Sequence, residues 1–217
     1  MPEPPYSDAE RAAIYRAIYQ RRDMRHFLPD PIDPALLRRL LDAAHHAPSV
    51  GFMQPWRFIR ISCLELRRSI HALVEQERIR TAEALNERED EFMKLKVEGI
   101  LDCAEVLVAA LCEQRGQHIF GRRTLPEMDL ASLSCAIQNM WLAARAEGIG
   151  LGWVSMFEPA ALKTSLNMPE DSQPFAVLCL GHVEQFYDQP MLEQEQWAAR
   201  KDLHDLLFEN TWNTPCR

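Results

Sequence analysis

Two long apolar stretches limit the folds open to this chain. The stretch MDLASLSCAIQNMWLAARAEGIG, residues 128–150, has the composition of a largely buried helix and contains Gly148, a residue type that commonly ends helices. The stretch AEVLVAALCE, residues 104–113, is apolar enough to be a strand at the centre of a sheet. Because both elements must bury their apolar surface against another layer, we predict an α+β fold with helices packed on a central sheet.

Caps and periodicity place the other elements. Ser7 and Glu10 form a capping box before a helix that runs toward residue 20. Asp33 as N-cap and Pro34 at the first helical position start a second helix, which stops near Pro48. The remaining predicted elements are strands at 56–62 and 175–183, a strand that opens after Gly150, a short helix at 159–168 and a helix at 200–210.

Residues 64–100 form a long charged stretch. Their composition favours helix, but the middle of the stretch is too polar to be buried throughout. We therefore expect its centre to project from the core as a lid or arm.

Length and charge exclude several classes of protein. With 217 residues, 47% of them hydrophobic, the chain is expected to form a single domain, 1–217. The net charge of -8 argues against nucleic-acid binding, which needs clustered basic side chains. The N-terminal MPEPPYSDAE has no apolar core of a signal peptide, and no apolar run reaches the roughly 20 residues of a membrane span. We expect a soluble cytoplasmic protein that contacts neither nucleic acid nor membrane.

The cysteines and histidines do not form a metal motif. The six cysteines include no C-x-x-C pair, and most lie in apolar runs, which favours buried thiols in a reducing compartment. His45 and His46 are adjacent, so on a helix their side chains point about 100° apart and cannot share one ion. The sequence predicts no metal site.

Nucleotide-binding and nucleophile motifs are also missing from the sequence. GIGLGWV, residues 148–154, follows a helix and opens a strand, which reverses the element order of a dinucleotide-binding motif. No P-loop lysine and no G-x-S-x-G elbow are present. Gly148 is better interpreted as a helix C-cap.

The stretch RRDMRHF, residues 21–27, places three arginines around one carboxylate. Arg21, Arg22 and Arg25 favour an anion, because guanidinium donors match phosphate oxygens. The alternative is that these arginines lie at a solvated helix end, where they interact favourably with the helix dipole. Asp23 is either a salt-bridge partner of Arg25, a helix cap or a positioned proton acceptor. Residue types alone leave these alternatives open.

Three stretches together resemble one known family. RRDMRHF at 21–27, AAHHAPSVGFMQPWRF at 43–58 and AEGIGLGWVSMF at 146–157 are similar, in order and spacing, to the nitroreductase-like flavoproteins. The resemblance covers nearly the whole chain. It implies a central mixed or antiparallel sheet flanked by helices, a helical lid, bound FMN, and a homodimer with its FMN sites at the subunit interface.

Two departures from most of that family indicate a branch. Asp23 stands where most members carry a small residue such as Ser, and Met53 stands where most carry Asn. Both departures resemble the flavin-destroying branch, in which reduced FMN is the substrate. That resemblance implies O₂-dependent cleavage of reduced FMN to 5,6-dimethylbenzimidazole, the lower ligand of cobalamin, and erythrose 4-phosphate. The alternatives are an NAD(P)H-dependent FMN nitroreductase or reductive dehalogenase, and a non-catalytic flavin carrier.

The resemblance assigns catalytic roles to Asp23 and Ser155. Asp23 would lie beside the flavin ring and move protons, in an ionised form that the neighbouring arginines favour. Ser155 would hydrogen-bond to reacting oxygen or hold Asp23, although a lone serine more often satisfies a strand-end backbone group. The implied FMN-binding residues are Arg21, Arg22, Asp23, Met24, Arg25, His45, Ser49, Gly51, Gln54, Val97, Ser155 and Arg200.

Individual roles follow for part of this set. Gly51 would let backbone approach a flat ring closely, Gln54 would pair with an amide edge, and Arg200 would be a second phosphate ligand. The partner subunit would contribute further walls of the site. Those walls are Met128, Asp129, Gln138 and Asn139.

The resemblance also implies partners. The apolar helix at 130–146 would form the dimer interface, and the C-terminal tail would pack on the partner subunit. The charged stretch at 75–96 would exclude water and a nicotinamide, so a separate flavin reductase would supply reduced FMN.

Overall fold

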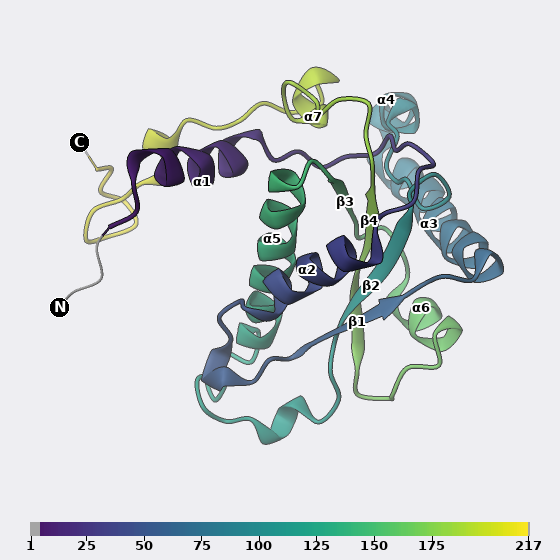
Figure 1. Ribbon diagram of the computed structural model, residues 1–217, viewed down its shortest axis with the longest axis horizontal. Helices are drawn as coiled ribbons and strands as arrows, with labels where there is room; N and C mark the ends of the chain where they lie inside the picture. Colours follow the sequence, from purple (N-terminus) through teal and green to yellow (C-terminus); the bar gives the residue numbers. More distant parts are fainter. Residues whose placement is uncertain (1–4, 217) are drawn as a thin grey trace. The chain divides into compact units, whose positions relative to one another are not determined.

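In the computed structural model, which describes residues 5–216, an antiparallel sheet organises the first of two units, Met1–Phe186. Its four strands follow the order β1-β2-β4-β3, and each neighbouring pair is antiparallel (Figure 1). The sheet therefore resolves the predicted mixed or antiparallel alternatives in favour of antiparallel. The strands are β1 (Trp56–Arg60), β2 (Glu105–Leu111), β3 (Gly150–Val154) and β4 (Gln173–Gly181).

The strand predicted to be central is central. Every residue of β2 is buried, because helices cover both faces of the sheet and β1 and β4 flank β2 on either side. Val108 of β2 faces Val177 of β4, and the register shifts between Ala109 and Ala110. A run of apolar residues without alternation is what such a doubly covered strand requires.

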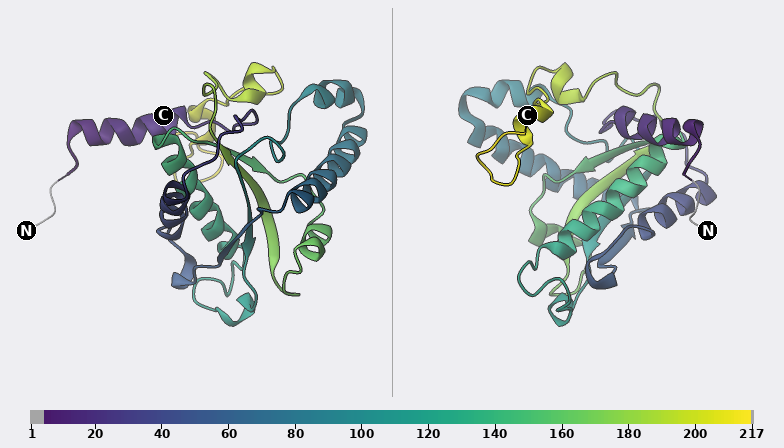
Figure 2. Two further views of the ribbon diagram at one scale, coloured as in Figure 1. Left: turned by 45° about the vertical axis from the view of Figure 1, so that its right-hand side comes forward. Right: turned by 90° about the vertical axis from the view of Figure 1, so that its left-hand side faces the viewer.

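Helices cover the two faces of the sheet with two separate cores. On one face, α2 (Pro34–His45) and α5 (Met128–Ala146) pack through residues such as Leu40 and Ile137. On the other face, α3 (Leu64–Leu85) and α6 (Pro159–Ser165) pack through a second cluster that includes Ile70. Figure 2 shows the sheet between these two pairs of helices. The result is the predicted α+β layering.

The first helix lies outside both cores. Helix α1 (Asp8–Gln20) begins with the predicted capping box, in which the Ser7 hydroxyl accepts from the Glu10 amide and Glu10 accepts from the Ser7 amide. None of its residues is buried. Its C-terminal end is fastened by Arg145, which donates to the Gln20 carbonyl at 3.2 Å.

The charged stretch forms a helical hairpin. Helix α3 leads through the short turn η2 (Asn86–Arg88) into α4 (Glu89–Lys94), whose Phe92 is buried. Arg78 of α3 closes the hairpin, because its Nη2 donates to the carbonyls of Met93 and Leu95. Helix α3 is thus anchored in the second core, and its lid function is still a prediction.

The second unit, Tyr187–Arg217, has little regular structure in its described part, 187–216. It contains α7 (Met191–Gln194) and the single turn η4 (Leu203–Leu206). The helix predicted at 200–210 is therefore wrong beyond that turn. The chain instead pairs with itself, because the amide of Glu209 donates to Thr214 and that of Cys216 donates to Leu207.

The cysteine prediction is correct for half of these residues. Cys103, Cys112 and Cys179 are buried. Cys63 and Cys135 are exposed, because one caps α3 and the other lies on the outer face of α5. Among residues 5–216, no helix combines the length and apolarity that a membrane crossing requires.

Candidate functional site

The RRDMRHF stretch runs along the edge of β3. The amide of Met24 donates to the Leu151 carbonyl at 3.0 Å, and Asp23 forms a parallel bridge with Leu151. Two glycines allow Met24 to pack closely against β3. A Cβ added at Gly152 would collide with the Met24 carbonyl oxygen, and one at Gly150 would lie 3.2 Å from Met24 Cγ. Two glycines two residues apart on one face of a strand were the sequence signal for this contact, and the sequence analysis missed it.

Both oxygens of Asp23 are held. Oδ1 accepts from the Trp153 amide at 2.9 Å, and Oδ2 accepts from Arg25 Nη2 at 2.6 Å. The side chain is still 41% exposed. Asp23 is therefore a fixed carboxylate with an accessible side, which suits a proton acceptor and also fulfils the alternative of a salt bridge to Arg25.

The pKa of Asp23 lies above its ordinary value. Burial raises the pKa, and this effect outweighs the opposing effects of Arg25, the Trp153 amide and Arg21. The expectation that the arginines would favour the ionised form is correct in sign, but it omitted the larger cost of removing the carboxylate from water.

Arg25 points into the protein. Its side chain is only 10% exposed, and Nη2 donates to the Trp153 carbonyl at 2.9 Å as well as to Asp23. A Cβ added at Gly152 would lie 2.9 Å from Arg25 Nη1, so the guanidinium lies directly over this glycine. The predicted phosphate contact of Arg25 is thus not supported by its orientation.

Arg21 and Arg22 are half-buried on the C-terminal half of α5. The Arg21 guanidinium lies 4.4 Å from the centroid of the Trp141 ring, and Trp141 Nε1 donates to the Arg22 carbonyl at 3.1 Å. Arg22 Nη1 donates to the carbonyl of Tyr19. Trp141, which the sequence analysis did not single out, therefore anchors the arginine stretch.

Ser155 lies at the same part of β3 as Asp23. It is exposed and comes directly after the strand, two residues beyond Trp153, whose amide holds Asp23. Two strand residues span about 7 Å. The two predicted catalytic residues are therefore brought to one place by β3.

The second stretch forms a tight turn at the other end of α5. In this turn, η1 (Val50–Phe52), the Val50 amide donates to Ser132 Oγ, and Ser49 Oγ accepts from the Gln54 amide, both at 3.0 Å. The positive φ of two non-glycine residues, Phe52 and Gln54, marks the turn as strained.

Gly51 is surrounded by the chain itself. Its φ is +53°, and an added Cβ would lie 2.9 Å from the Phe120 carbonyl oxygen. The close approach that a glycine permits is therefore used here by the loop before α5, which differs from the expected approach of a flat ring.

His45 has a structural contact. Its Nδ1 accepts from Trp56 Nε1 at 3.3 Å, and the two rings meet edge to face with centroids 6.1 Å apart. This contact fastens the end of α2 to the start of β1.

The arginine stretch and the turn at 49–54 contact α5 at different levels. The arginine stretch contacts Trp141 and the turn at 49–54 contacts Ser132, nine residues earlier on α5. At 1.5 Å per residue, these contacts lie about 14 Å apart along the helix. Figure 1 shows α1 at one end of α5 and the turn after α2 near the other.

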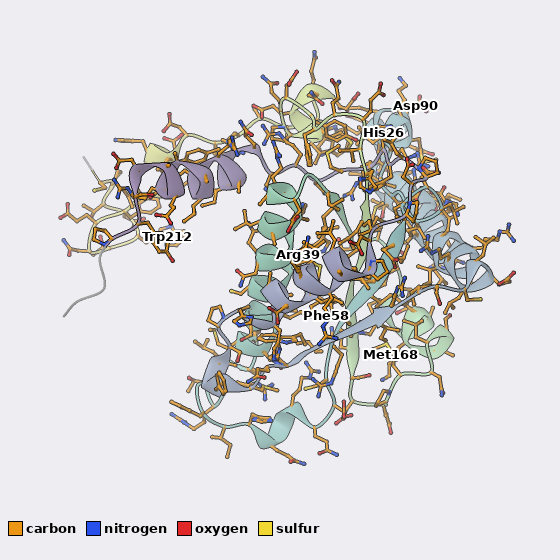
Figure 3. The ribbon with its side chains drawn as sticks, viewed as in Figure 1. His26, Arg39, Phe58, Asp90, Met168 and Trp212 are labelled. Atoms are coloured by element: carbon orange, nitrogen blue, oxygen red, sulfur yellow. The ribbon has the colours of Figure 1, made fainter. Side chains whose placement is uncertain are left out.

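The chain returns from the α3–α4 hairpin to the site through residues 97–99. A Cβ added at Gly99 would collide with the Phe27 ring and would lie 3.0 Å from the Arg25 carbonyl oxygen. Val97, two residues earlier, is half-buried. Figure 3 labels His26 in the segment that receives this contact. Arg200 belongs to the second unit, and its assignment is still a prediction.

Asp129 organises the loop before α5. It is 5% exposed in its side chain, and its Oδ2 accepts from Arg115 at 3.2 Å and from Arg122 at 2.8 Å. These three residues border an open cavity of about 410 Å³. The Asp129 carboxylate is thus paired within its own chain. A contribution of this segment to a partner's site would come from Met128 or from the surface of the loop.

One group of potential metal ligands occurs in the described part of the chain. His71 and Glu75 of α3 and Glu98 lie with their ligand atoms within 4.8 Å of one another. His71 is 3.6 Å from Glu98, and Arg78 is 3.3 Å from Glu75. Pairing within the chain accounts for this group, and the predicted lack of a metal remains a prediction.

A family model matches most of the first unit. Residues 18–182 match the family described as the nitroreductase family. The chain belongs to the nitroreductase family. The matched range contains all three stretches that resemble flavoproteins, and it ends before the second unit.

Two relatives are similar to this chain over most of their length. The 5,6-dimethylbenzimidazole synthase of Rhodospirillum rubrum is 39% identical over 190 residues, which cover 85% of this chain and 89% of the relative. A protein of the same name from Rhodobacter capsulatus is 37% identical over 195 residues, which cover 88% and 94%. Both relatives have the same name, which is that of an enzyme.

A solved structure shares the fold of this chain. Iodotyrosine deiodinase bound to FMN and 3-iodo-L-tyrosine superposes with a TM-score of 0.70 at 18% identity, covering 93% of this chain and 99% of that chain. At this identity the likeness concerns the fold alone.

Proposed function

We propose that this protein is a 5,6-dimethylbenzimidazole synthase that uses reduced FMN and O₂ as substrates. It cleaves the flavin to 5,6-dimethylbenzimidazole, for the lower ligand of cobalamin, and to erythrose 4-phosphate. The observation that carries the proposal is the 37–39% identity to two relatives of that name over 85–88% of the chain. The fixed Asp23 on β3 supports the same reading.

The residues present fit an FMN. Half-buried Arg21 and Arg22 lie side by side on α5 and provide positive charge for a phosphate, with Arg200 as a further ligand. Ser49 and Gln54 provide polar groups for the ring, and the exposed apolar Phe52 between them provides a flat surface. Reduced FMN supplies the electrons for O₂ and the carbon skeleton of the product.

Asp23 moves protons in this proposal. Its carboxylate is held by the Trp153 amide and Arg25, and its raised pKa makes it a better proton acceptor than an ordinary aspartate. Ser155, exposed beyond the end of β3, hydrogen-bonds to reacting oxygen or to Asp23.

A homodimer completes the site. The arginine stretch and the turn at 49–54 occupy different levels of α5 in one chain, so a second copy brings one stretch against the other. Large apolar side chains are exposed beside both stretches, including Tyr19 at 70%, Phe52 at 83% and Phe120 at 83%. Such patches are typical of interfaces.

The remaining parts of the proposal concern supply and access. The α3–α4 hairpin acts as a lid that excludes water and a nicotinamide, because it returns to the site through Gly99. A separate cytoplasmic flavin reductase supplies reduced FMN. The second unit, a tail of the single domain 1–217, packs on the partner subunit.

Product analysis tests the proposal. Purified protein is mixed anaerobically with chemically reduced FMN, air is admitted, and 5,6-dimethylbenzimidazole is sought by mass spectrometry, with reduced FMN alone as the control. The expected result is product with matching loss of flavin. Full recovery of yellow FMN without a fragment would refute the proposal, and NAD(P)H-dependent reduction of FMN would then favour the nitroreductase alternative.

A further inference from the structure

We infer that Arg25 is a positioning residue that holds the Asp23 carboxylate in place, and that it is not a ligand of the flavin phosphate. This inference rests on the proposed function for its meaning, because it assigns the part that Arg25 plays at the same site. It separates Arg25 from Arg21 and Arg22, which share its stretch and its charge.

Three hydrogen bonds form a closed ring. Arg25 Nη2 donates to Asp23 Oδ2 at 2.6 Å and to the Trp153 carbonyl at 2.9 Å. The Trp153 amide donates to Asp23 Oδ1 at 2.9 Å. One residue of β3 therefore provides both a donor and an acceptor, and Arg25 links the acceptor to the carboxylate. This arrangement fixes the carboxylate in both position and rotation.

Burial separates Arg25 from a phosphate. Its side chain is 10% exposed, whereas Arg21 and Arg22 are half-buried. The guanidinium lies against Gly152, where a Cβ would come within 2.9 Å of Nη1. A phosphate dianion would have to displace the strand or pull the guanidinium away from Asp23 and the Trp153 carbonyl, and either change loses contacts that the structure shows.

The surroundings of Asp23 make Arg25 the main source of compensating charge. Among the charged groups that act on Asp23, Arg25 lowers its pKa most, and Arg21 contributes less. From β3 the contribution is the uncharged Trp153 amide. On β4, the buried Cys179 also senses the charge of Arg25. Loss of Arg25 therefore raises the pKa of Asp23 further.

Titration of Asp23 tests this role without any flavin. The Asp23 Cγ resonance is followed against pH in the wild type, Arg25→Met and Arg25→Lys. Arg57→Met is the control, because Arg57 is an exposed residue of β1. The proton affinity of Asp23 is expected to rise at least about tenfold in Arg25→Met, to change less in Arg25→Lys, and to stay unchanged in the control. If Arg25→Met does not fold, Arg25→Lys carries the comparison. An unchanged affinity in the Arg25 variant would overturn the inference.

Flavin discrimination tests the phosphate alternative. The affinities for FMN and riboflavin, which differ by the phosphate, are measured in the wild type, Arg25→Lys and Arg25→Met, with Arg22→Met for comparison. The ratio of the two affinities is expected to stay within about twofold of the wild type in the Arg25 variants. A fall of about tenfold or more would assign Arg25 to the phosphate. A wild type that binds neither flavin would contradict the proposed function, while the titration would still decide the role of Arg25.

Discussion

At the residue scale, Asp23 and Arg25 show how two neighbours of one short stretch take different tasks. They are two residues apart, so their side chains leave an extended segment on the same side. The carboxylate keeps an accessible face, whereas the guanidinium turns inward over Gly152. The geometry shows the salt bridge to Arg25 and leaves the Asp23 carboxylate accessible, so the salt bridge is compatible with the proposed role as a proton acceptor.

Replacement of Asp23 separates chemistry from binding. Asp23→Asn is expected to retain FMN binding, because the arginines remain, and to lower product formation at least about 100-fold, because the proton acceptor is gone. Product is measured by mass spectrometry and binding by flavin fluorescence. A yield equal to that of the wild type would remove Asp23 from its role.

The acidic limb of the pH profile reports the same residue. Because burial raises the pKa of Asp23, a base in this position loses its proton only above the ordinary pKa of aspartate, 3.8. Product formation should therefore decline with falling pH at values above 3.8, as measured in a series of buffers at saturating flavin. A decline that lies at or below this pH would show that a different group limits the rate.

Gly152 tests the packing beneath the site. Gly152→Ala is expected to lower the free energy of unfolding by about 3 kcal/mol, because its Cβ would meet the Met24 backbone, which cannot move without displacing the Asp23 segment. Urea denaturation measures the change. Gly116→Ala is the matched control, since a Cβ there meets nothing within 4 Å. Equal stability of the two variants would contradict the tight crossing.

At the element scale, one side chain links the two helices of the α3–α4 hairpin. Arg78 joins α3 to the carbonyls of Met93 and Leu95, and the chain then returns to the site through Gly99. The charged composition of 64–100 predicted a helix with a polar middle. The structure adds the hydrogen bonds of Arg78, which hold α3 to the segment that follows α4. Phe92 is the buried residue of the short helix α4.

Loss of this fastening should loosen the hairpin. Arg78→Met is expected to speed amide hydrogen exchange over residues 89–97 at least about tenfold while the central strands keep their protection. Arg80→Met is the control, because the side chain of Arg80 is 55% exposed and lies 3.9 Å from Glu77. Unchanged exchange in Arg78→Met would show that the packing of Phe92 suffices.

At the scale of the whole molecule, the proposed dimer rests on the positions of the arginine stretch and the turn at 49–54. Helix α5 separates the arginine stretch from the turn at 49–54, and exposed apolar residues accompany both. The apolar residues of α5 that predicted the interface are mostly used inside the chain, since six of them are buried: Leu133, Ala136, Ile137, Met140, Trp141 and Ala144. The exposed apolar surface lies on α1 and on the loop before α5 instead.

Charge placed on that surface should disrupt the dimer. Phe120→Asp and Ile18→Asp are expected to shift the protein from dimer to monomer in light scattering and to weaken FMN binding at least about tenfold, because each site then lacks the other copy. Leu64→Asp, at an exposed position at the start of α3, is the control. A wild type that is monomeric at the highest concentrations would refute the shared site.

Much of the fold was predictable because its signals are local. The capping box at Ser7, the cap at Asp33 and the stop at Gly148 act within a few residues, so the sequence predicts them correctly. The helix expected at 200–210 shows the limit of local signals. There, pairing of residue 207 with 216 and of 209 with 214 replaces the helical hydrogen bonds.

By itself the sequence determined the starts of α1 and α2, the end of α5, the central position of β2 and, through three short stretches, the family. The tertiary structure alone decided the strand order, the inward orientation of the Arg25 side chain, and the separation of the arginine stretch from the turn at 49–54 along α5. The physical reason is the sequence separation over which each interaction acts. Caps and periodicity depend on neighbours within about one helical turn, whereas the carboxylate of Asp23 is held by Trp153, a residue 130 positions away.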